Sequence, residues 1–506
     1  MQYPDIDDDS SWFSRYRCRG RTISRPTETF DVSFGSSKHL TINQERFEDD
    51  THHFDTYVSI QGEVVVRRSS PKDKTPHPSV VVEVTANDDR ILSKIETQWN
   101  PSDQSLTIKT PDGINTGQRN LQLCATVKAT VWVPEDAELN YLQIATIHLG
   151  VQLLDNLSLT VKTLARFDAV AGDIISASAA GKKSASQKTT WKEKNPPSDT
   201  SPSTYAFHPR RVEGCTTSGH ISGVWPLFDS LILKSTSGNI KIGVEPHDAW
   251  DEDSKENAEL AIRSTSGDVD FHTHGITSND DSSSRNQGVN VGEEGVPNRN
   301  YVLDVHTTSG NVHGLAAFGP TGGATVKSTS GTLKLGLLPV LQSADDTKPV
   351  EVSTSSTSGT TYVTILDPVY FSSSSLSSSI SVSSSSSSSS PHLTPTSSHS
   401  SFNSLTSPSL SPPPLRNIHD QHTSTSGDFH LYLPLSWEGE IVMTSLSGKL
   451  GVSGKDVKLI KSGEKWPGFN KELVARKGDV GGGGDKGEGS RVRVGLTSGS
   501  GEVRVG

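Results

Sequence analysis

The segment LILKSTSGNIKIGV, residues 231–244, decides the fold of this chain. Apolar residues alternate with polar ones on both sides of a Ser-Thr-Ser-Gly step, with Leu231 and Leu233 before it and Ile240 and Ile242 after it. A period of two is typical of a β-strand that has one buried and one exposed face. Glycine allows a positive φ or a close backbone approach. The segment therefore predicts two short strands joined at a glycine corner.

Copies of this segment recur along the chain, for example LAIRSTSGDVDFHT at 260–273 and ATVKSTSGTLKLGL at 324–337. The predicted corner glycines are Gly172, Gly219, Gly238, Gly267, Gly310, Gly331, Gly359, Gly427, Gly448 and Gly501. Where no polar insertion intervenes, the repeat is about 20 residues long, which lies in the range of solenoid repeats. One copy cannot bury its own apolar face, but stacked copies can. We therefore predict an all-β fold, a single-stranded parallel β-solenoid with rungs of about 20 residues.

A β-hairpin with a Ser-Gly or Gly-Asn turn is the alternative for each repeat, and it would build a meander, a sandwich or a propeller. A four-stranded propeller blade needs about 40 residues, roughly twice the length of this repeat. The repeat length therefore favours the solenoid.

The domain organisation follows from composition. We expect a disordered N-terminus at 1–28, an N-terminal β cap at 29–120 and the repeats at 121–506. Four polar or low-complexity insertions are expected to loop out of the repeats, because they cannot offset their ordering entropy by burial: 181–211, 276–299, the Ser/Pro-rich 372–414, and 478–490.

Charge and hydropathy argue against several classes of protein. The net charge of -11 gives no basic footprint for nucleic acid, so no nucleic-acid partner is predicted. There is no run of 18 apolar residues, so no transmembrane segment is predicted. The first residues carry aspartates where a signal peptide would carry basic residues, so no export signal is visible.

The three cysteines, Cys18, Cys124 and Cys215, are too few and too scattered to predict a disulfide framework or a zinc site. We therefore favour a reducing compartment. Because no export signal is visible either, we expect a cytoplasmic location slightly more than one at the cell surface.

Catalysis on a parallel β-helix would need clustered carboxylates on neighbouring rungs. The position after each corner glycine is the natural row for them, and it carries Asp173, His220, Asn239, Asp268, Asn311, Thr332, Thr360, Asp428, Lys449 and Glu502. No two adjacent rungs in this row offer a carboxylate pair. We interpret the row as corner residues that suit the backbone geometry, and we predict no catalytic residues.

Histidines are the remaining candidates for chemistry. His272 and His274 share one strand face, His52 and His53 are adjacent, and His306 and His313 flank one corner. A metal site needs three or four ligands in a closed geometry. We therefore predict neither a metal site nor a cofactor. The Gly-rich stretch at 481–489 is interpreted as a linker rather than a calcium-binding repeat.

The recurring Ser/Thr-x-Ser-Gly-Asp/Asn-Val/Ile step resembles the "putative adhesin" repeat family of bacteria and fungi. Val133-Pro134, which leads into LNYLQI at 139–144, is also typical of that family. The resemblance covers residues 121–506 apart from the insertions. It implies a β-solenoid without known catalysis. The chain departs from the family in lacking a visible export signal.

These observations predict a non-catalytic binding or structural scaffold, not an enzyme, whose partner is an unknown protein or carbohydrate. Two alternatives stay open, a carbohydrate-active β-helix enzyme and a cell-surface or wall-associated adhesin. Two or more carboxylates on neighbouring rungs of a cleft would favour the enzyme, and an upstream signal peptide would favour the adhesin.

Overall fold

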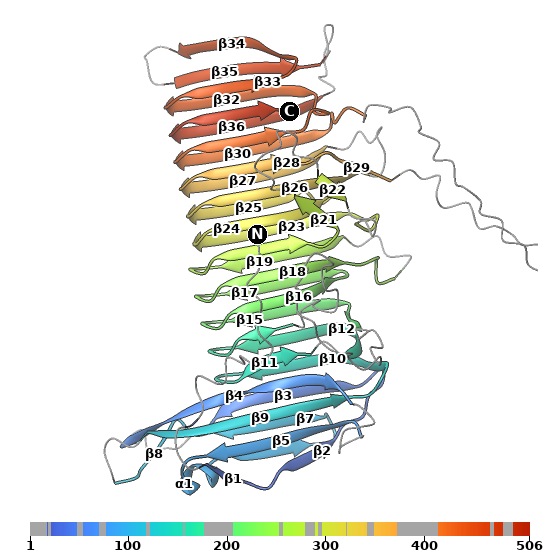
Figure 1. Ribbon diagram of the computed structural model, residues 1–506, viewed down its shortest axis with the longest axis vertical. Helices are drawn as coiled ribbons and strands as arrows, with labels where there is room; N and C mark the ends of the chain where they lie inside the picture. The colour runs from blue at the N-terminus through green and yellow to red at the C-terminus, as the bar shows by residue number, and fades with distance from the viewer. Residues whose placement is uncertain are drawn as a thin grey trace, which may run out of the picture.

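The computed structural model describes residues 18, 22–47, 54–69, 77–117, 122–154, 157–176, 206–251, 257–278, 289–291, 296–319, 321–341, 349–371, 413–465, 470–478 and 489–506. These ranges are nearly all β, as the period-two pattern predicts, and they form an elongated stack of strands (Figure 1). Two large sheets share one hydrophobic core that runs the length of the stack.

Each sheet collects strands from the whole length of the chain. Sheet A contains β1 (Ile23–Ser24), β2 (Glu28–Asp31), β4 (Thr56–Arg68), β5 (Ser79–Ala86), β8 (Gly113–Ile114), β9 (Leu123–Val133), β11 (Gly150–Leu153), β13 (Ile174–Ile175), β16 (Ile221–Leu227), β18 (Ile240–Pro246), β20 (Val269–Thr273), β24 (Val312–Phe318), β26 (Leu333–Leu341), β28 (Thr361–Ile365), β29 (Val369–Tyr370), β31 (Phe429–Leu433), β33 (Leu450–Gly454) and β37 (Gly501–Val505). Sheet B contains β3 (His39–Arg46), β6 (Glu96–Asn100), β7 (Ser105–Thr110), β10 (Ala137–Thr146), β12 (Ser158–Ala169), β14 (Ala206–Pro209), β15 (Arg211–Thr216), β17 (Ser230–Ser235), β19 (Ala258–Ser264), β23 (Tyr301–Ser309), β25 (Ala324–Ser330), β27 (Val350–Ser358), β30 (Ile418–Ser426), β32 (Gly439–Ser447), β34 (Val457–Lys465), β35 (Asn470–Lys477) and β36 (Ser490–Ser498).

The two strands of one repeat lie in different sheets. In the segment 231–244, β17 joins sheet B and pairs in parallel with β15 and β19. After the corner, β18 joins sheet A and pairs in parallel with β16 and β20. We call such a pair of strands a rung. The hairpin alternative is therefore wrong for this repeat, because the strands that flank its glycine are not hydrogen-bonded partners.

The core is built from columns of inward residues, one from each rung. Leu233, Ile262, Val305 and Val326 are in register on successive strands of sheet B, and all four are fully buried. Full burial of one such side chain contributes about 1.5–3 kcal/mol. A single rung has no neighbour to bury it, so the stack is the stable unit.

Near the C-terminal end, the order of strands in space departs from the order in the chain. Strand β36 pairs in parallel with β30 on one side and with β32 on the other (Figure 1). In the same way, β37 pairs in parallel with β31 and with β33. The last repeat of the sequence is thus inserted between the two repeats before it. Beyond β32, the antiparallel strands β35 and β34 end sheet B.

The N-terminal end shows the same kind of insertion. Strand β3 lies between β7 and β10, and β4 lies between β9 and β11, in each case through parallel pairing. Antiparallel strands end the stack here as well, β6 on β7 and β5 on β9. Helix α1 (Asp89–Leu92) adds the buried Ile91 and Leu92 to this end of the core.

Several expected boundaries need correction. The parallel pairing reaches β3 and β4, so the range 29–120, expected as an N-terminal β cap, contributes paired strands to the stack as well as the antiparallel strands at its end. Residues 23–24 and 28 belong to β1 and β2, which pair with β5, although 1–28 was expected to be disordered. Edge pairing with a long apolar strand orders these short polar segments.

Two insertions are also shorter than expected. Strand β14 lies inside 181–211 and pairs in parallel with β12. Within 276–299, β21 (Ile276–Ser278) and β22 (Val289–Val291) form a two-stranded antiparallel sheet. Buried Arg299, from the same range, forms an ion pair with buried Asp229, which also binds Arg210. The expected loops at 181–205, 279–288, 292–295, 372–412 and 479–488 lie outside the described residues.

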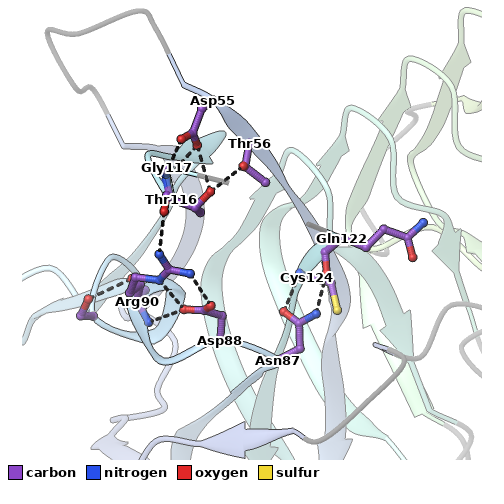
Figure 2. A network of polar contacts seen from close by, with 10 residues as sticks. Asp55, Thr56, Asn87, Asp88, Arg90, Thr116, Gly117, Gln122 and Cys124 are labelled. Carbon is purple, nitrogen blue, oxygen red and sulfur yellow. Dashed lines mark hydrogen bonds and ion pairs between the residues drawn. The ribbon is translucent and has the colours of Figure 1, made fainter. Parts of the chain in front are cut away.

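Cys18 and Cys124 form a disulfide across a sequence separation of 106 residues. The expectation of unpaired cysteines in a reducing compartment is corrected for this pair, because disulfides persist in oxidising environments. Asn87 holds the backbone beside Cys124, accepting from its N–H at 3.0 Å and donating to Gln122 O at 2.7 Å (Figure 2). Nearby, Asp55 accepts from the N–H of Thr116 at 2.8 Å.

One strand breaks the apolar pattern of the core. Asp420, His422 and Ser424 on β30 point inward and are at most 3% exposed. His422 Nδ1 lies 2.8 Å from Thr354 Oγ1, whereas both carboxylate oxygens of Asp420 have no hydrogen-bond partner among the described residues. The neighbours of Asp420 in its column are Val352 and Val492. Burial raises the pKa of Asp420 to about 8 and lowers the pKa of His422 to about 3.

Candidate binding groove

The Ser-Thr-Ser-Gly step builds the corner through its hydroxyl groups. The first serine is buried and closes the turn, since Ser235 Oγ donates to Gly238 O at 2.7 Å and Ser264 Oγ donates to Gly267 O at 2.8 Å. The second serine links rungs, since Ser237 Oγ donates to Thr217 O and Ser266 Oγ to Thr236 O, both at 3.0 Å. The same link recurs at Ser218, Ser309, Ser330, Ser358, Ser426 and Ser498.

The corner glycines form one column in which each stands against the carbonyl oxygen of its neighbour. A Cβ on Gly238 would fall well within 3.0 Å of Gly219 O, and the same holds along the column through Gly172, Gly219, Gly267, Gly310, Gly331, Gly359, Gly427, Gly499 and Gly448. Close backbone approach therefore excludes a side chain at each corner. The prediction for the last corner is wrong: Gly499 occupies the column, whereas Gly501 begins β37 and faces Leu496 and Met443.

The position after the glycine forms a second ladder. Asp268 Oδ1 accepts from Asn311 N at 2.7 Å, and Asn311 Oδ1 accepts from Thr332 N at 3.0 Å. The same capping joins Asp173 to His220, His220 to Asn239, Asn239 to Asp268 and Asp428 to Ser500. These carboxylates and amides therefore satisfy backbone N–H groups of the next rung, which is a structural use of the row.

We expect Asn311→Ala to lower the free energy of unfolding by about 1 kcal/mol, because it removes the acceptor for Thr332 N at a solvent-exposed corner. The measurement is chemical denaturation of the purified chain. Thr332→Ala is the matched control, since no hydrogen bond to the next rung is found for its hydroxyl in the described residues. Equal losses in both variants would contradict the capping role.

A groove of about 820 Å³ runs along the outer side of this corner from β10 to β27. Most of the residues that line it are of polar type: Thr146, Asp168, Ala169, Val170, Cys215, Thr216, Thr217, Lys234, Ser235, Thr236, Arg263, Ser264, Thr265, His306, Thr307, Thr308, Lys327, Ser328, Thr329, Ser355 and Thr357. The groove therefore crosses successive rungs rather than lying within one of them.

Two rows of side chains follow the groove. The first holds the exposed threonines that precede the second serine of each step: Thr217, Thr236, Thr265, Thr308, Thr329 and Thr357. Among the described residues, their hydroxyl groups form no hydrogen bonds within the chain. They therefore offer one donor and acceptor per rung to a ligand.

The second row is basic. Lys234, Arg263, His306 and Lys327 are in register on β17, β19, β23 and β25. Each is the fourth residue before its corner glycine. The row is not evident within any one repeat, although its fixed offset from the corner glycine is a signal in the sequence by which it can be found.

Carboxylates beside the groove are held by basic side chains. Asp304 accepts from Arg263 at 2.6 Å and lies 2.7 Å from His306 Nε2. Asp168 accepts from Arg166 Nε at 2.7 Å. Cys215 continues the basic row toward the N-terminus, and burial, followed by the charge of Asp168, raises the pKa of its thiol.

The other histidine candidates do not assemble a site. His272 and His274 stack with ring centroids 5.2 Å apart, and burial lowers the pKa of His272. His306 and His313 do not meet across their corner, because His306 pairs with Asp304 and His313 lies 3.7 Å from Asp270 on the other sheet. His52 and His53 lie outside the described residues. No group of three metal-binding side chains occurs among those described.

No family model and no curated protein matches the chain. Among solved structures, it is similar to a "putative adhesin" from Parabacteroides merdae, 8% identical, over 70% of this chain and 94% of that chain, with a TM-score of 0.19. A second "putative adhesin", from Parabacteroides distasonis, is 10% identical over the same shares, also with a TM-score of 0.19. At this TM-score the conclusions about this chain rest on its own residues.

Among the residues that the structure covers, no helix has the length and apolar character needed to cross a bilayer.

Proposed function

We propose that the chain is a parallel β-solenoid of the adhesin type that acts as a non-catalytic binding scaffold, and that the groove is its binding site. The parallel register of successive repeats in both sheets supports the solenoid assignment. Each rung adds one exposed hydroxyl and one further outward side chain to the same groove. A ligand that extends along the stack would meet the same chemistry at every step of about 4.8 Å.

One observation carries this proposal. The groove crosses successive rungs without interruption, and the hydroxyls of its row of exposed threonines form no hydrogen bonds inside the described part of the chain. A row of unpaired hydroxyls at constant spacing suits a linear ligand with repeating polar groups, such as a polysaccharide.

The non-catalytic part of the proposal is supported by how the carboxylates are used. Asp168 and Asp304 at the groove are neutralised by ion pairs. Asp268 and Asp428 in the post-glycine row accept backbone N–H groups. General acid–base cleavage of a glycosidic bond needs a pair of carboxyl groups free to act on it. If the chain were instead a carbohydrate-active enzyme, the polysaccharide bound in the groove would be cleaved.

The experiment compares binding with cleavage on a panel of soluble linear polysaccharides, neutral and acidic. We expect at least one to bind the chain and to keep its chain length after long incubation, as measured by size-exclusion chromatography. Shortening of the polymer would overturn the non-catalytic proposal in favour of the enzyme.

The groove is tested with Thr265→Val combined with Thr308→Val, which removes two central hydroxyls and keeps β-branched side chains. The matched control is Thr425→Val with Thr497→Val, in exposed corner positions of the same step beyond the groove. We expect the first pair to weaken binding about tenfold and the control to leave it unchanged. Equal effects of both pairs, or binding to no polymer, would reject the groove as the site.

A further inference from the structure

We infer that the groove selects an acidic linear polysaccharide, one that carries carboxylates at regular intervals. This inference rests on the proposed function and names the ligand class of the same groove. It follows from the charge of the basic row and from the kinds of side chain that line the groove.

The charge comes from the two ends of the row. Lys234 and Lys327 are exposed, and neither forms an ion pair in the described part of the chain. They are three rungs apart, which corresponds to about 14 Å along the stack. Two lysine ammonium groups at this separation fit two carboxylates on an extended polymer better than one compact anion.

The centre of the row is nearly neutral. Arg263 forms an ion pair with Asp304, which also lies 2.7 Å from His306 Nε2, so the positive charge of Arg263 is largely balanced within the chain. The basic row therefore presents two separated positive charges with a polar stretch between them, flanked by threonine hydroxyls. A polymer with hydroxyl groups between its carboxylates matches this order.

The positive charge of the basic row contrasts with the negative net charge of the whole chain. The chain carries a net charge of -11, so a general attraction of anions is not expected. An acidic ligand would have to be held by local contacts with Lys234 and Lys327. Salt should weaken these contacts, because both ammonium groups are exposed.

The lining disfavours two other linear polyanions. No phenylalanine, tyrosine or tryptophan lines the groove, and the imidazole of His306 is paired with Asp304, so single-stranded nucleic acid would lack the row of stacking platforms on which its bases are usually held. An acidic peptide that binds by strand addition needs an exposed sheet edge. The groove instead crosses paired strands in the middle of sheet B.

The test uses oligogalacturonate as the acidic probe, a neutral malto-oligosaccharide of equal length and single-stranded DNA. Isothermal titration at low salt measures their affinities for the full chain and for Lys234→Ser combined with Lys327→Ser. Serine or threonine stands at the equivalent position of later repeats, Ser355 and Thr423, so these substitutions suit the fold. The control is Lys455→Ser with Lys458→Ser, two exposed lysines near the C-terminal end that give the same change in net charge.

We expect the groove double variant to weaken oligogalacturonate binding about tenfold, the control to change it less than about twofold, and added salt to reduce the difference. Equal weakening by both variants, or tighter binding of DNA, would overturn the inference. The inference would also be overturned if the neutral oligosaccharide bound as tightly as oligogalacturonate and neither lysine double variant changed its affinity. That result would leave the proposed scaffold function intact.

Discussion

Gly238→Ala should destabilise the chain by about 3 kcal/mol or prevent folding, because the new Cβ would overlap the carbonyl oxygen of Gly219. Relief would require two paired rungs to separate, and the hydrogen bonds between them hold those rungs in register. Gly331→Ala should do at least as much harm, since Gly331 also has a φ of +124°. Thermal and chemical denaturation of the purified variants measures both losses.

His272→Ala and His274→Ala are the controls for the corner variants. Their imidazole rings stack on each other at the outer side of sheet A, and truncation leaves the core intact. Each should cost less than about 1 kcal/mol. Similar melting temperatures for all four variants would show that the glycine column is not what holds the rungs together.

Asp420→Val should stabilise the chain by roughly 4 kcal/mol at pH 8 and above. The carboxyl is buried without a hydrogen-bond partner among the described residues, and its column neighbours are already valines. Valine therefore removes a desolvated polar group from a site that accepts its shape. The measurement is the free energy of unfolding of the variant and of the unmodified chain between pH 4 and pH 9.

The pH dependence of this stability difference shows whether the Asp420 carboxyl causes it. Burial raises the pKa of Asp420 in the folded chain to about 8, above the ordinary value of 3.8. Its contribution to stability is therefore fully present below pH 3.8 and is lost as the pH rises through 8. The advantage of the variant should grow between those limits and then stay constant.

Gln421→Val controls for strand propensity, because Gln421 is the exposed neighbour of Asp420 on the same strand. Its effect should be small and independent of pH. An advantage of Asp420→Val that does not change with pH would mean that the buried carboxyl is not the source of the stabilisation.

The fold of one repeat could be predicted from the sequence because local chemistry specifies it. Alternation fixes which side chains of β17 and β18 face inward, and the glycine between them fixes the corner. The insertion of β36 between β30 and β32 could not be predicted. All repeats share one pattern, so any strand could pair with any other, and long-range pairing alone decides their order.

The same limit applies to the ends of the stack and to the disulfide. The strands at 23–24 and 28 are too short and polar to predict by themselves, and they form because β5 lies beside them. Cys18 and Cys124 meet because residue 124 is in β9, deep in the N-terminal part of sheet A. Cysteine spacing along the chain carries no information about that proximity.

Of the two rows of side chains that follow the groove, only the threonine row could be predicted from the sequence. The Thr-Ser-Gly step predicts a ladder of hydroxyl groups at the corner, which the structure contains. The basic row was missed because Lys234 and Lys327 are far apart in the chain and become a set only when the repeats are placed in register. Functional rows on a stacked repeat protein are found by comparing one position across repeats.

The placement of β36 and of β3 has a consequence for how the molecule comes apart. In an ordinary repeat array, the terminal unit has one neighbour and frays first. Here β36 has a parallel neighbour on each side, β30 and β32, and so does β3, between β7 and β10. Pulling β36 or β3 out of its sheet must break two interfaces at once, so local unfolding should begin at the antiparallel strands outside them and not at these strands.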